Sequence, residues 1–406
     1  MARTRKPDPR GAADEAAGTL GRLAERTRGE QPKGARAVSA RPLSAPQSVA
    51  LPEPFPLYRG GSLPAARIGY ESWGQLNERA DNVILLFTGL SPSAHAASNA
   101  ADPSPGWWER MIGPGLAIDT DRYFVVCINS LGSCFGSTGP ASIDAQTGER
   151  YRLNFPEIAV EDIAAAGMAA LRALGIERLD AVIGASLGGM SVLAFATQFP
   201  HAARRLISIS GSPAASPFAI ALRSVQREAI MRDPDWQGGQ YAPEHPPRSG
   251  MRIARKLGTI TYRSAAEWRA RFGRETLAGN ARSLSPFAPR FAVEGYLESQ
   301  AERFTRVFDP NCYLYLSRAM DRFDLAEHGG SAAAALRAVS AEDVLIIGVQ
   351  SDLLFPIEEQ AAIAQAFRDN ATPVHFAPLP SLEGHDAFLV DFARFDPEIR
   401  SFLSRS

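Results

Sequence analysis

Ser186 lies in a Gly-x-Ser-x-Gly pattern made by Gly184, Ser186 and Gly188. An apolar run precedes the pattern and a second apolar, helix-prone run follows it, which predicts a tight turn from a strand into a helix. Glycine has no side chain to collide in such a turn. The pattern alone is a weak signal, because an incidental glycine-rich turn can match it. In this context Ser186 is predicted to be a catalytic nucleophile.

A serine hydroxyl needs a base within hydrogen-bonding reach, usually a histidine held by a carboxylate. When the serine lies on a strand-to-helix turn, the chain order is serine, acid, histidine, which excludes His95 among the six histidines. His385 is the predicted base, because it lies in a loop between the last expected strand and the last expected helix. The other downstream histidines begin a surface helix, lie between prolines, precede a glycine pair or lie inside a strand: His201, His245, His328 and His375.

The acid should follow the strand before that loop, and Asp352 comes two residues after the apolar run 344–350. A helix N-cap is the alternative role for Asp352, whereas Asp343 precedes the strand and would lie at the wrong edge of the sheet. Backbone N–H groups of Leu187 and Leu90 are predicted to form the oxyanion hole, since both follow expected strands.

Short apolar runs alternate with helix-length segments from residue 51 onward, which predicts a mostly parallel sheet flanked by helices. Together with the tight turn predicted at Ser186, this alternation predicts the α/β class and the α/β-hydrolase fold with an inserted helical lid. The expected strands are 67–73, 82–88, 123–129, 181–185, 205–210, 344–350 and 374–379. The expected helices are 157–174, 187–198 and 356–367.

Three regions are expected along the chain. Residues 1–48 carry ten basic and five acidic side chains and no aromatic one, so a disordered tail is predicted; its acidic residues argue against the alternative of a transit peptide. Residues 49–212 and 341–406 should form the core domain. Residues 213–340 are helix-prone and lack a convincing strand, which predicts a lid subdomain.

The composition describes an ordinary globular protein of 406 residues, with a net charge of −1. Such a charge favours neither nucleic acid nor an anionic membrane as a partner. Three cysteines at irregular spacing suggest a reducing compartment rather than disulfides or a metal site. We therefore expect a cytoplasmic protein that binds small molecules and no metal.

Four segments together resemble the homoserine and serine O-acyltransferase family over about residues 50–405. They read FTGLSPSAHAASN (87–99), NSLGSCFGSTGP (129–140), GASLGGM (184–190) and SDLLFP (351–356). The resemblance implies a ping-pong reaction in which Ser186 takes an acyl group from acyl-coenzyme A and passes it to an amino-acid hydroxyl. It implies acyl-coenzyme A as co-substrate with no further cofactor, and a homodimer formed through the lid.

The resemblance also implies roles for individual residues. Arg227 is similar to the family arginine that holds the substrate carboxylate, although a solvated arginine on a helix is the alternative. Asp386, beside His385, is similar to the residue that receives the substrate ammonium group. Arg322 stands where acetyl-transferring members have an aromatic residue, and a guanidinium there favours the second carboxylate of a succinyl group.

The loop Ser91-Pro92-Ser93-Ala94 differs from the usual homoserine form, and Pro92 is expected to shorten the acceptor pocket. The pattern most resembles the serine O-succinyltransferase branch, which supplies cysteine synthesis. Homoserine O-succinyl- or O-acetyltransferase, in methionine synthesis, is the first alternative. An esterase or thioesterase is the second, because a triad alone does not choose between water and an amino acid. His95 could contact substrate or be structural.

Overall fold

The computed structural model describes residues 47–277 and 287–405. Within these residues, eight strands form the central sheet in the order β1-β4-β8-β5-β9-β10-β11-β12. Strands β8 to β12 of this order run parallel, whereas β4 is antiparallel to both β1 and β8. The strands are β1 (Gln47–Ala50), β4 (Arg67–Trp73), β5 (Val83–Phe87), β8 (Phe124–Ile128), β9 (Leu179–Ala185), β10 (Ala203–Ile209), β11 (Asp343–Val349) and β12 (Val374–Leu379). Two short pairs lie outside it: β2 (Phe55–Pro56) with β3 (Ser62–Leu63), and β6 (Ile112–Gly113) with β7 (Ile118–Asp119).

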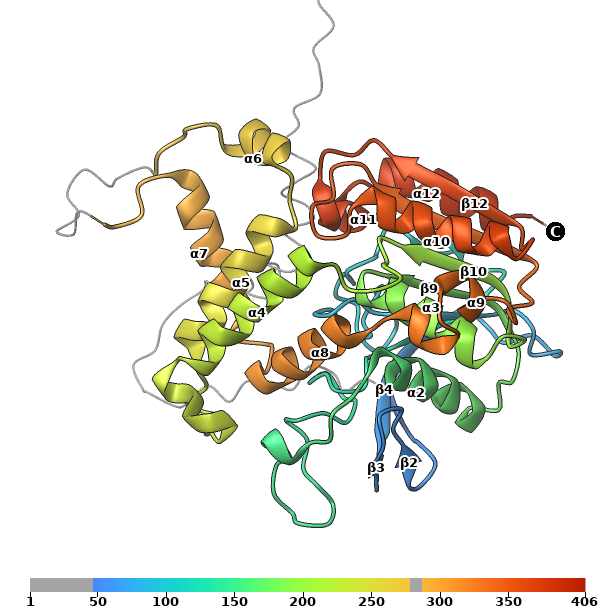
Figure 1. The fold of residues 1–406 in the computed structure, drawn as a ribbon, viewed down its shortest axis with the longest axis horizontal. Helices are drawn as coiled ribbons and strands as arrows, with labels where there is room; N and C mark the ends of the chain where they lie inside the picture. The colour runs from blue at the N-terminus through green and yellow to red at the C-terminus, as the bar shows by residue number, and fades with distance from the viewer. Residues whose placement is uncertain (1–46, 278–286, 406) are drawn as a thin grey trace, which may run out of the picture.

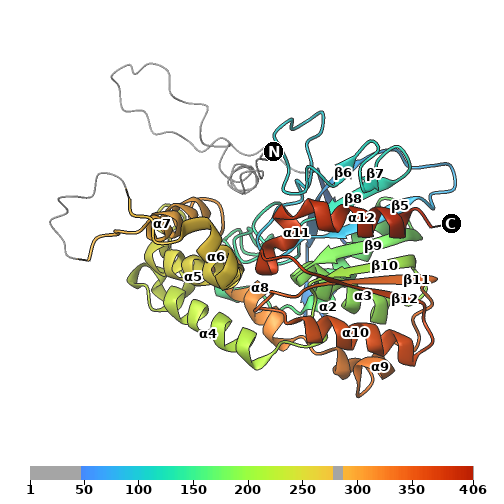
Figure 2. The same cartoon turned by 90° about the horizontal axis from the view of Figure 1, so that it is seen from above.

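Helices cover both faces of this sheet (Figure 2). Strands β5 and β9 are buried along their whole lengths, as expected of parallel strands covered on both sides. Alternate residues of β5 join two different apolar clusters, one with helices α2, α3 and α10 and the other with α12. These helices are α2 (Val160–Ala173), α3 (Leu187–Gln198), α10 (Ile357–Asp369) and α12 (Phe392–Leu403), with the short α11 (Ala387–Val390) before α12.

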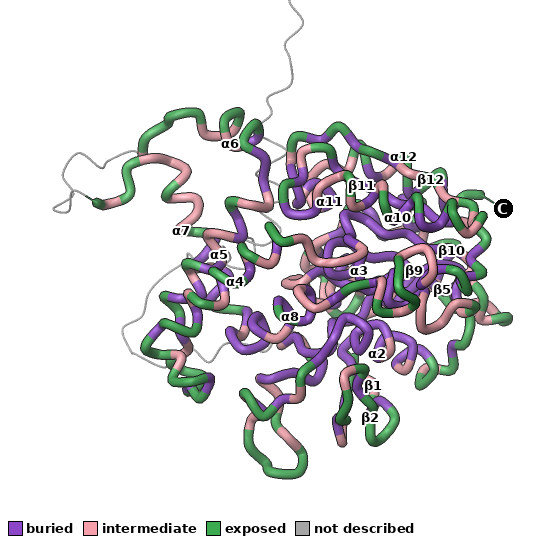
Figure 3. Tube along the Cα trace, viewed as in Figure 1, coloured by how far each residue is buried: buried purple, intermediate pink, exposed green. Residues whose placement is uncertain are grey.

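Of the helices that the structure describes between β10 and β11, five lie to one side of the sheet (Figure 1). They are α4 (Pro217–Met231), α5 (Arg248–Thr261), α6 (Ala265–Phe272), α7 (Ala292–Phe304) and α8 (Pro310–Arg322). Proline at the first turn and a side-chain N-cap begin two of them, Ser216 for α4 and Asp309 for α8. Burial is continuous through the sheet and less complete in these helices (Figure 3).

The α/β-hydrolase fold predicted from the sequence is confirmed, and every expected strand lies within two residues of its predicted bounds. Two details differ. The predicted tail to residue 48 includes Gln47 and Ser48, which belong to β1 and pair with β4. Strand β1 is short and mostly exposed, so it has no hydrophobic pattern by which it could be predicted. The rest of the predicted tail, residues 1–46, lies outside the described residues.

The end of the predicted lid packs on the core. Short helix α9 (Ala332–Ala335) contacts α10, where the side-chain amide of Asn370 donates to the carbonyl of Ala333 at 2.6 Å. The N–H of Ser340 donates to the carbonyl of Pro200 at 2.9 Å. The helices set apart from the sheet therefore end before the boundary expected at residue 340.

Candidate active site

Ser186 occupies a strained turn between β9 and α3. Its φ of 58° and ψ of −120° are values that residues other than glycine rarely adopt. The turn is so tight that a Cβ on Gly184 would lie 2.2 Å from the carbonyl oxygen of Gly188. A Cβ on Gly188 would lie 2.5 Å from the carbonyl oxygen of Phe87. The two glycines of the motif thus permit the sharp turn that presents the serine hydroxyl above the sheet edge.

The structure brings Ser186, His385 and Asp352 together from three separate loops at the carboxyl edge of the parallel strands. Ser186 Oγ lies 2.8 Å from His385 Nε2, and His385 Nδ1 lies 2.7 Å from Asp352 Oδ2. Asp352 Oδ1 accepts 2.9 Å hydrogen bonds from the N–H groups of Leu354 and Phe355. All three residues of the triad are buried. In this arrangement His385 can take the proton of Ser186 while Asp352 holds the imidazole.

A small cavity opens beside the serine. Ser186, His385 and Asp386 line it from the core, and lid helices α4, α5 and α8 contribute the opposite wall. Leu90, Ser91 and Pro92 also line it, so the predicted oxyanion residue and half of the predicted acceptor loop lie at the nucleophile. Leu187, the other predicted oxyanion residue, is the first residue of α3. Ser93 and Ala94 are not among the residues that line the cavity: the Ser93 carbonyl accepts from Trp107 Nε1 at 3.0 Å, and Ala94 is fully buried.

Comparison with known proteins places this geometry in a family. The family model described as alpha/beta hydrolase fold matches residues 82–391. A serine O-succinyltransferase of Litchfieldella anticariensis is 57% identical over 359 residues, which cover 88% of this chain and 98% of that protein. A serine O-succinyltransferase of Stenotrophomonas maltophilia is 57% identical over 355 residues, covering 87% and 96%. The chain belongs to the homoserine and serine O-acyltransferase family. It is an O-acyltransferase.

Solved structures resemble most of the acyltransferase chain. The homoserine O-acetyltransferase of Bacillus anthracis has a TM-score of 0.81 and 29% identity, with 89% of this chain and 97% of that one covered. Esterase E22 has a TM-score of 0.79 and also 29% identity, with 88% and 99% covered. This fold therefore carries both acyl transfer to an amino acid and ester hydrolysis.

The lid contacts the catalytic histidine loop of the acyltransferase directly. The N–H of Asp386 donates to the carbonyl of Tyr262 at 3.1 Å, and Gly384 has a φ of 68° with no room for a Cβ against that carbonyl. Asp386, the predicted ammonium-binding residue, lines the cavity, and its Oδ2 lies 3.4 Å from Nε of Arg263. The carboxylate of Asp386 therefore lies at the cavity and also forms an ion pair with Arg263 of the lid.

The structure does not bring the predicted arginines, Arg227 and Arg322, to the cavity wall. The guanidinium of Arg227 lies 2.6 Å from Asp321 and 3.4 Å from the Ser317 hydroxyl. Arg322 is ion-paired with Glu157 and is one-third exposed. Their roles in binding carboxylates stay predictions. Instead Arg223, one helical turn before Arg227 on α4, lines the cavity; its position in the same arginine-containing helical stretch was the available sequence signal.

Within residues 47–277 and 287–405, no cluster of His, Cys, Asp or Glu side chains could hold a metal ion. No helix in that part of the chain is long and apolar enough to cross a membrane.

The pH dependence of the acyltransferase should follow His385. Burial by itself lowers the pKa of His385, but the charge of Asp352 and the hydrogen bond to it raise the pKa more, so that it lies above the ordinary value of 6.5. The base must be neutral to accept a proton. We expect kcat/KM to fall as the pH decreases, with the midpoint of this fall above 6.5. A pH–rate profile whose acidic midpoint lies below 6.5 would contradict the assignment.

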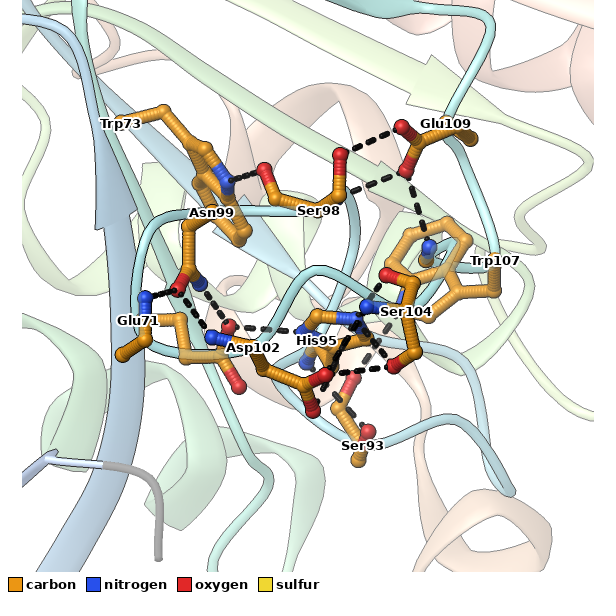
Figure 4. Close-up of polar contacts among 12 residues, drawn as sticks. Glu71, Trp73, Ser93, His95, Ser98, Asn99, Asp102, Ser104, Trp107 and Glu109 are labelled. Carbon is orange, nitrogen blue, oxygen red and sulfur yellow. Dashed lines mark hydrogen bonds and ion pairs between the residues drawn. The ribbon is translucent and has the colours of Figure 1, made fainter. Parts of the chain in front are cut away.

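His95 is at the centre of a polar network beside the loop of residues 91–94 (Figure 4). Its Nδ1 lies 2.9 Å from Glu71 Oε2, and its Nε2 lies 2.8 Å from the carbonyl of Ser104. Both ring nitrogens face acceptors, so both can donate only when the ring is protonated. Burial lowers the pKa of His95, but the hydrogen bonds to Glu71 and Ser104 and the charges of Glu71 and Asp102 raise it to about 9. His95 is not among the cavity-lining residues, which favours the structural role.

Replacing His95 with glutamine should therefore destabilise the fold in a pH-dependent way. Because the pKa of His95 is raised by folding, its stabilisation is complete below about pH 6.5 and is lost as the pH rises through about 9. At pH 7 we expect the variant to lose about 1.5–3 kcal/mol in the free energy of unfolding, measured with urea. At pH 10 the two proteins should differ less. An equal difference at both pH values would indicate a neutral His95.

Proposed function

We propose that the acyltransferase moves a succinyl group from succinyl-coenzyme A to the hydroxyl of L-serine, giving O-succinyl-L-serine for cysteine biosynthesis. The observation that carries this proposal is the 57% identity, over 88% of the chain, to a protein named serine O-succinyltransferase. The hydrogen-bonded triad supports it, because an acyl-enzyme on Ser186 links the two half-reactions.

In the first half-reaction, Ser186 Oγ attacks the thioester carbonyl while His385 Nε2 takes its proton. Backbone N–H groups of Leu187 and Leu90 would stabilise the oxyanion. The C–S bond then breaks, the leaving thiolate of coenzyme A takes the proton from His385 and becomes the free thiol, and the succinyl group remains as an ester on Ser186. In the second half-reaction His385 deprotonates the serine substrate, whose oxygen attacks this ester. The bond to Ser186 Oγ breaks and the proton returns to it.

Transfer to an amino acid competes with hydrolysis, so water must be kept from the acyl-enzyme. Lid residues Leu222, Tyr313 and Met320 contribute apolar surface to the cavity. Asp386 lies at the same cavity, where we propose that it receives the ammonium group of the acceptor. Pro92, which also lines it, is proposed to limit the acceptor length, a difference of one methylene worth about 1–3 kcal/mol.

The test is coenzyme A release by the purified protein with succinyl- or acetyl-coenzyme A, each combined with L-serine, L-homoserine or no acceptor. Turnover that needs both succinyl-coenzyme A and serine is the expected result. Preference for homoserine or for acetyl-coenzyme A would replace the proposed substrates and leave the family unchanged. Steady release of coenzyme A without an acceptor would favour a thioesterase. This second candidate is supported by the likeness to esterase E22.

We further propose a homodimer in the cytoplasm, with no cofactor besides the co-substrate. Apolar side chains Val225, Ile253 and Ile260 are exposed on α4 and α5 of the lid, where a second copy could cover them. The cysteines are all free, as in a reducing compartment. Light scattering should give twice the mass of the chain, and Ile253→Glu should shift it toward the monomer. A monomeric wild-type protein would refute the dimer.

A further inference from the structure

A lid segment is in direct contact with the loop that carries the catalytic histidine. The segment is residues 262–264, between α5 and α6, and the loop is residues 382–386. The hydroxyl of Ser264 donates to the carbonyl of Leu382 at 2.5 Å. At Gly384 the two backbones approach so closely that a Cβ would lie 2.9 Å from the backbone nitrogen of Ser264. The lid therefore touches the histidine loop through backbone as well as side chains.

Arg263, inside this lid segment, contacts the loop on either side of His385. Its side chain is 10% exposed. Nη1 lies 2.5 Å from Oε2 of Glu383, and Nε lies 3.4 Å from Oδ2 of Asp386. A third carboxylate, that of buried Glu267 on α6, lies 4.0 Å from Nη1. One guanidinium thus bridges two residues that lie before and after the catalytic base.

The catalytic base and the Asp386 carboxylate are held by different parts of the molecule. His385 is held by the core, because its Nδ1 lies 2.7 Å from Asp352 Oδ2 and its Nε2 lies 2.8 Å from Ser186 Oγ. Asp386 depends on the lid, since Arg263 is the only ion-pair partner of its carboxylate among the described residues. Loss of the Arg263 side chain should therefore displace the carboxylate and leave the base in place.

We propose that Arg263 is a positioning residue, which orients the Asp386 carboxylate toward the amino group of the acceptor. This inference rests on the proposed function, in which Asp386 receives the ammonium group. Glu383 has the closer contact with Arg263, so the longer contact orients Asp386 without neutralising it. Without the guanidinium the two carboxylates would lose the cation that they share, and like charges repel. Because Asp386 lines the cavity and Glu383 does not, this repulsion would displace the anion that the acceptor needs.

The first test needs no acyl transfer to an amino acid. Hydrolysis of p-nitrophenyl acetate, a neutral ester, reports on the triad. L-Alanine has the ammonium and carboxylate groups of serine but no hydroxyl, and propionate lacks the ammonium group as well; each is added as an inhibitor. We expect Arg263→Gln to weaken inhibition by L-alanine about 10-fold, whereas inhibition by propionate and the uninhibited rate should change less. Equal potency of L-alanine on both proteins, an equal loss for propionate, or no inhibition of the wild type by L-alanine would overturn the inference.

A double variant shows whether Arg263 acts through Asp386. Asp386→Asn removes the carboxylate itself and should weaken inhibition by L-alanine at least as much as Arg263→Gln. Adding Arg263→Gln to Asp386→Asn should then cost little more, because two residues that act through one contact are not additive. Additive losses would show that Arg263 acts by another route and would refute the positioning role.

The second test uses acyl transfer itself. The KM of the amino-acid acceptor should rise about 10-fold in Arg263→Gln. Burst release of coenzyme A without an acceptor measures the first half-reaction, and it should change less than this KM. An equal loss in the burst and in the KM would show a general structural role and contradict the proposal.

Two further variants separate charge from folding. Arg263→Lys keeps the cation but not the fork that reaches both carboxylates, so it should recover part of the lost potency; it carries the test if the glutamine variant does not fold. A lysine variant that lost the uninhibited rate as much as the potency would refute the proposal. Arg269→Gln changes an exposed arginine on α6 and should behave as wild type. A wild-type protein that uses neither succinyl-coenzyme A nor serine, but is inhibited as expected, would refute the proposed function alone.

Discussion

Replacing Ser186 with alanine should abolish acyl transfer, with kcat reduced by about 10⁶. The substitution removes the oxygen that lies 2.8 Å from His385 Nε2, so no acyl-enzyme can form and the acceptor hydroxyl has no ester to attack. Measurement of coenzyme A release gives the rate. Mass spectrometry of the protein after mixing with acyl-coenzyme A should show an acyl adduct on the wild type and none on the variant.

The matched control is Ser224→Ala on lid helix α4. Ser224 is exposed and its hydroxyl bonds only to the carbonyl of Ala221, at 2.7 Å, among the described residues. This variant should keep wild-type activity and the adduct. A Ser186→Ala protein that folds normally, retains more than about 1% of kcat and still forms an adduct would refute the nucleophile assignment.

Replacing Asp352 with asparagine should lower kcat by about 10⁴. Oδ1 of Asp352 accepts from two backbone N–H groups, those of Leu354 and Phe355, so the single oxygen of asparagine should face them. The amide NH₂ would then point at His385 Nδ1. Since two donors cannot face each other, His385 would carry its proton on Nε2 instead, and Nε2 could no longer accept the proton of Ser186.

The chain contains a second aspartate–histidine pair that serves as a control. Asp343 Oδ1 lies 3.2 Å from Nε2 of His375, at the opposite ends of strands β11 and β12 from the triad. Asp343→Asn should leave kcat unchanged. If Asp352→Asn kept more than about a tenth of the activity, or if Asp343→Asn lost as much, the catalytic acid would have been misassigned. Thermal melts of both variants exclude unfolding as the cause.

Most of the fold and the triad could be predicted, because they depend on short-range patterns. The apolar runs of the central parallel strands β5, β9 and β11 are continuous, and these strands are buried on both faces. Ser186 was identified by two glycines within two residues of it, and Asp352 and His385 by their places after the last strands. Strand β1 was not predicted, because its four residues are mostly exposed and only the partner strand defines them.

The sequence by itself determined the family and predicted the serine, the histidine and the aspartate that lie within hydrogen-bonding distance of one another, since each prediction depends on residues close together or on chain order. Only the tertiary structure decided which arginine faces the cavity. Arg223 and Arg227 lie one helical turn apart, and their roles depend on Asp321, 98 positions from Arg223. Arg322 pairs with Glu157, 165 positions away. The direction of a long, charged side chain depends on such distant partners and on the packing of the lid. Neither can be predicted from a local sequence pattern.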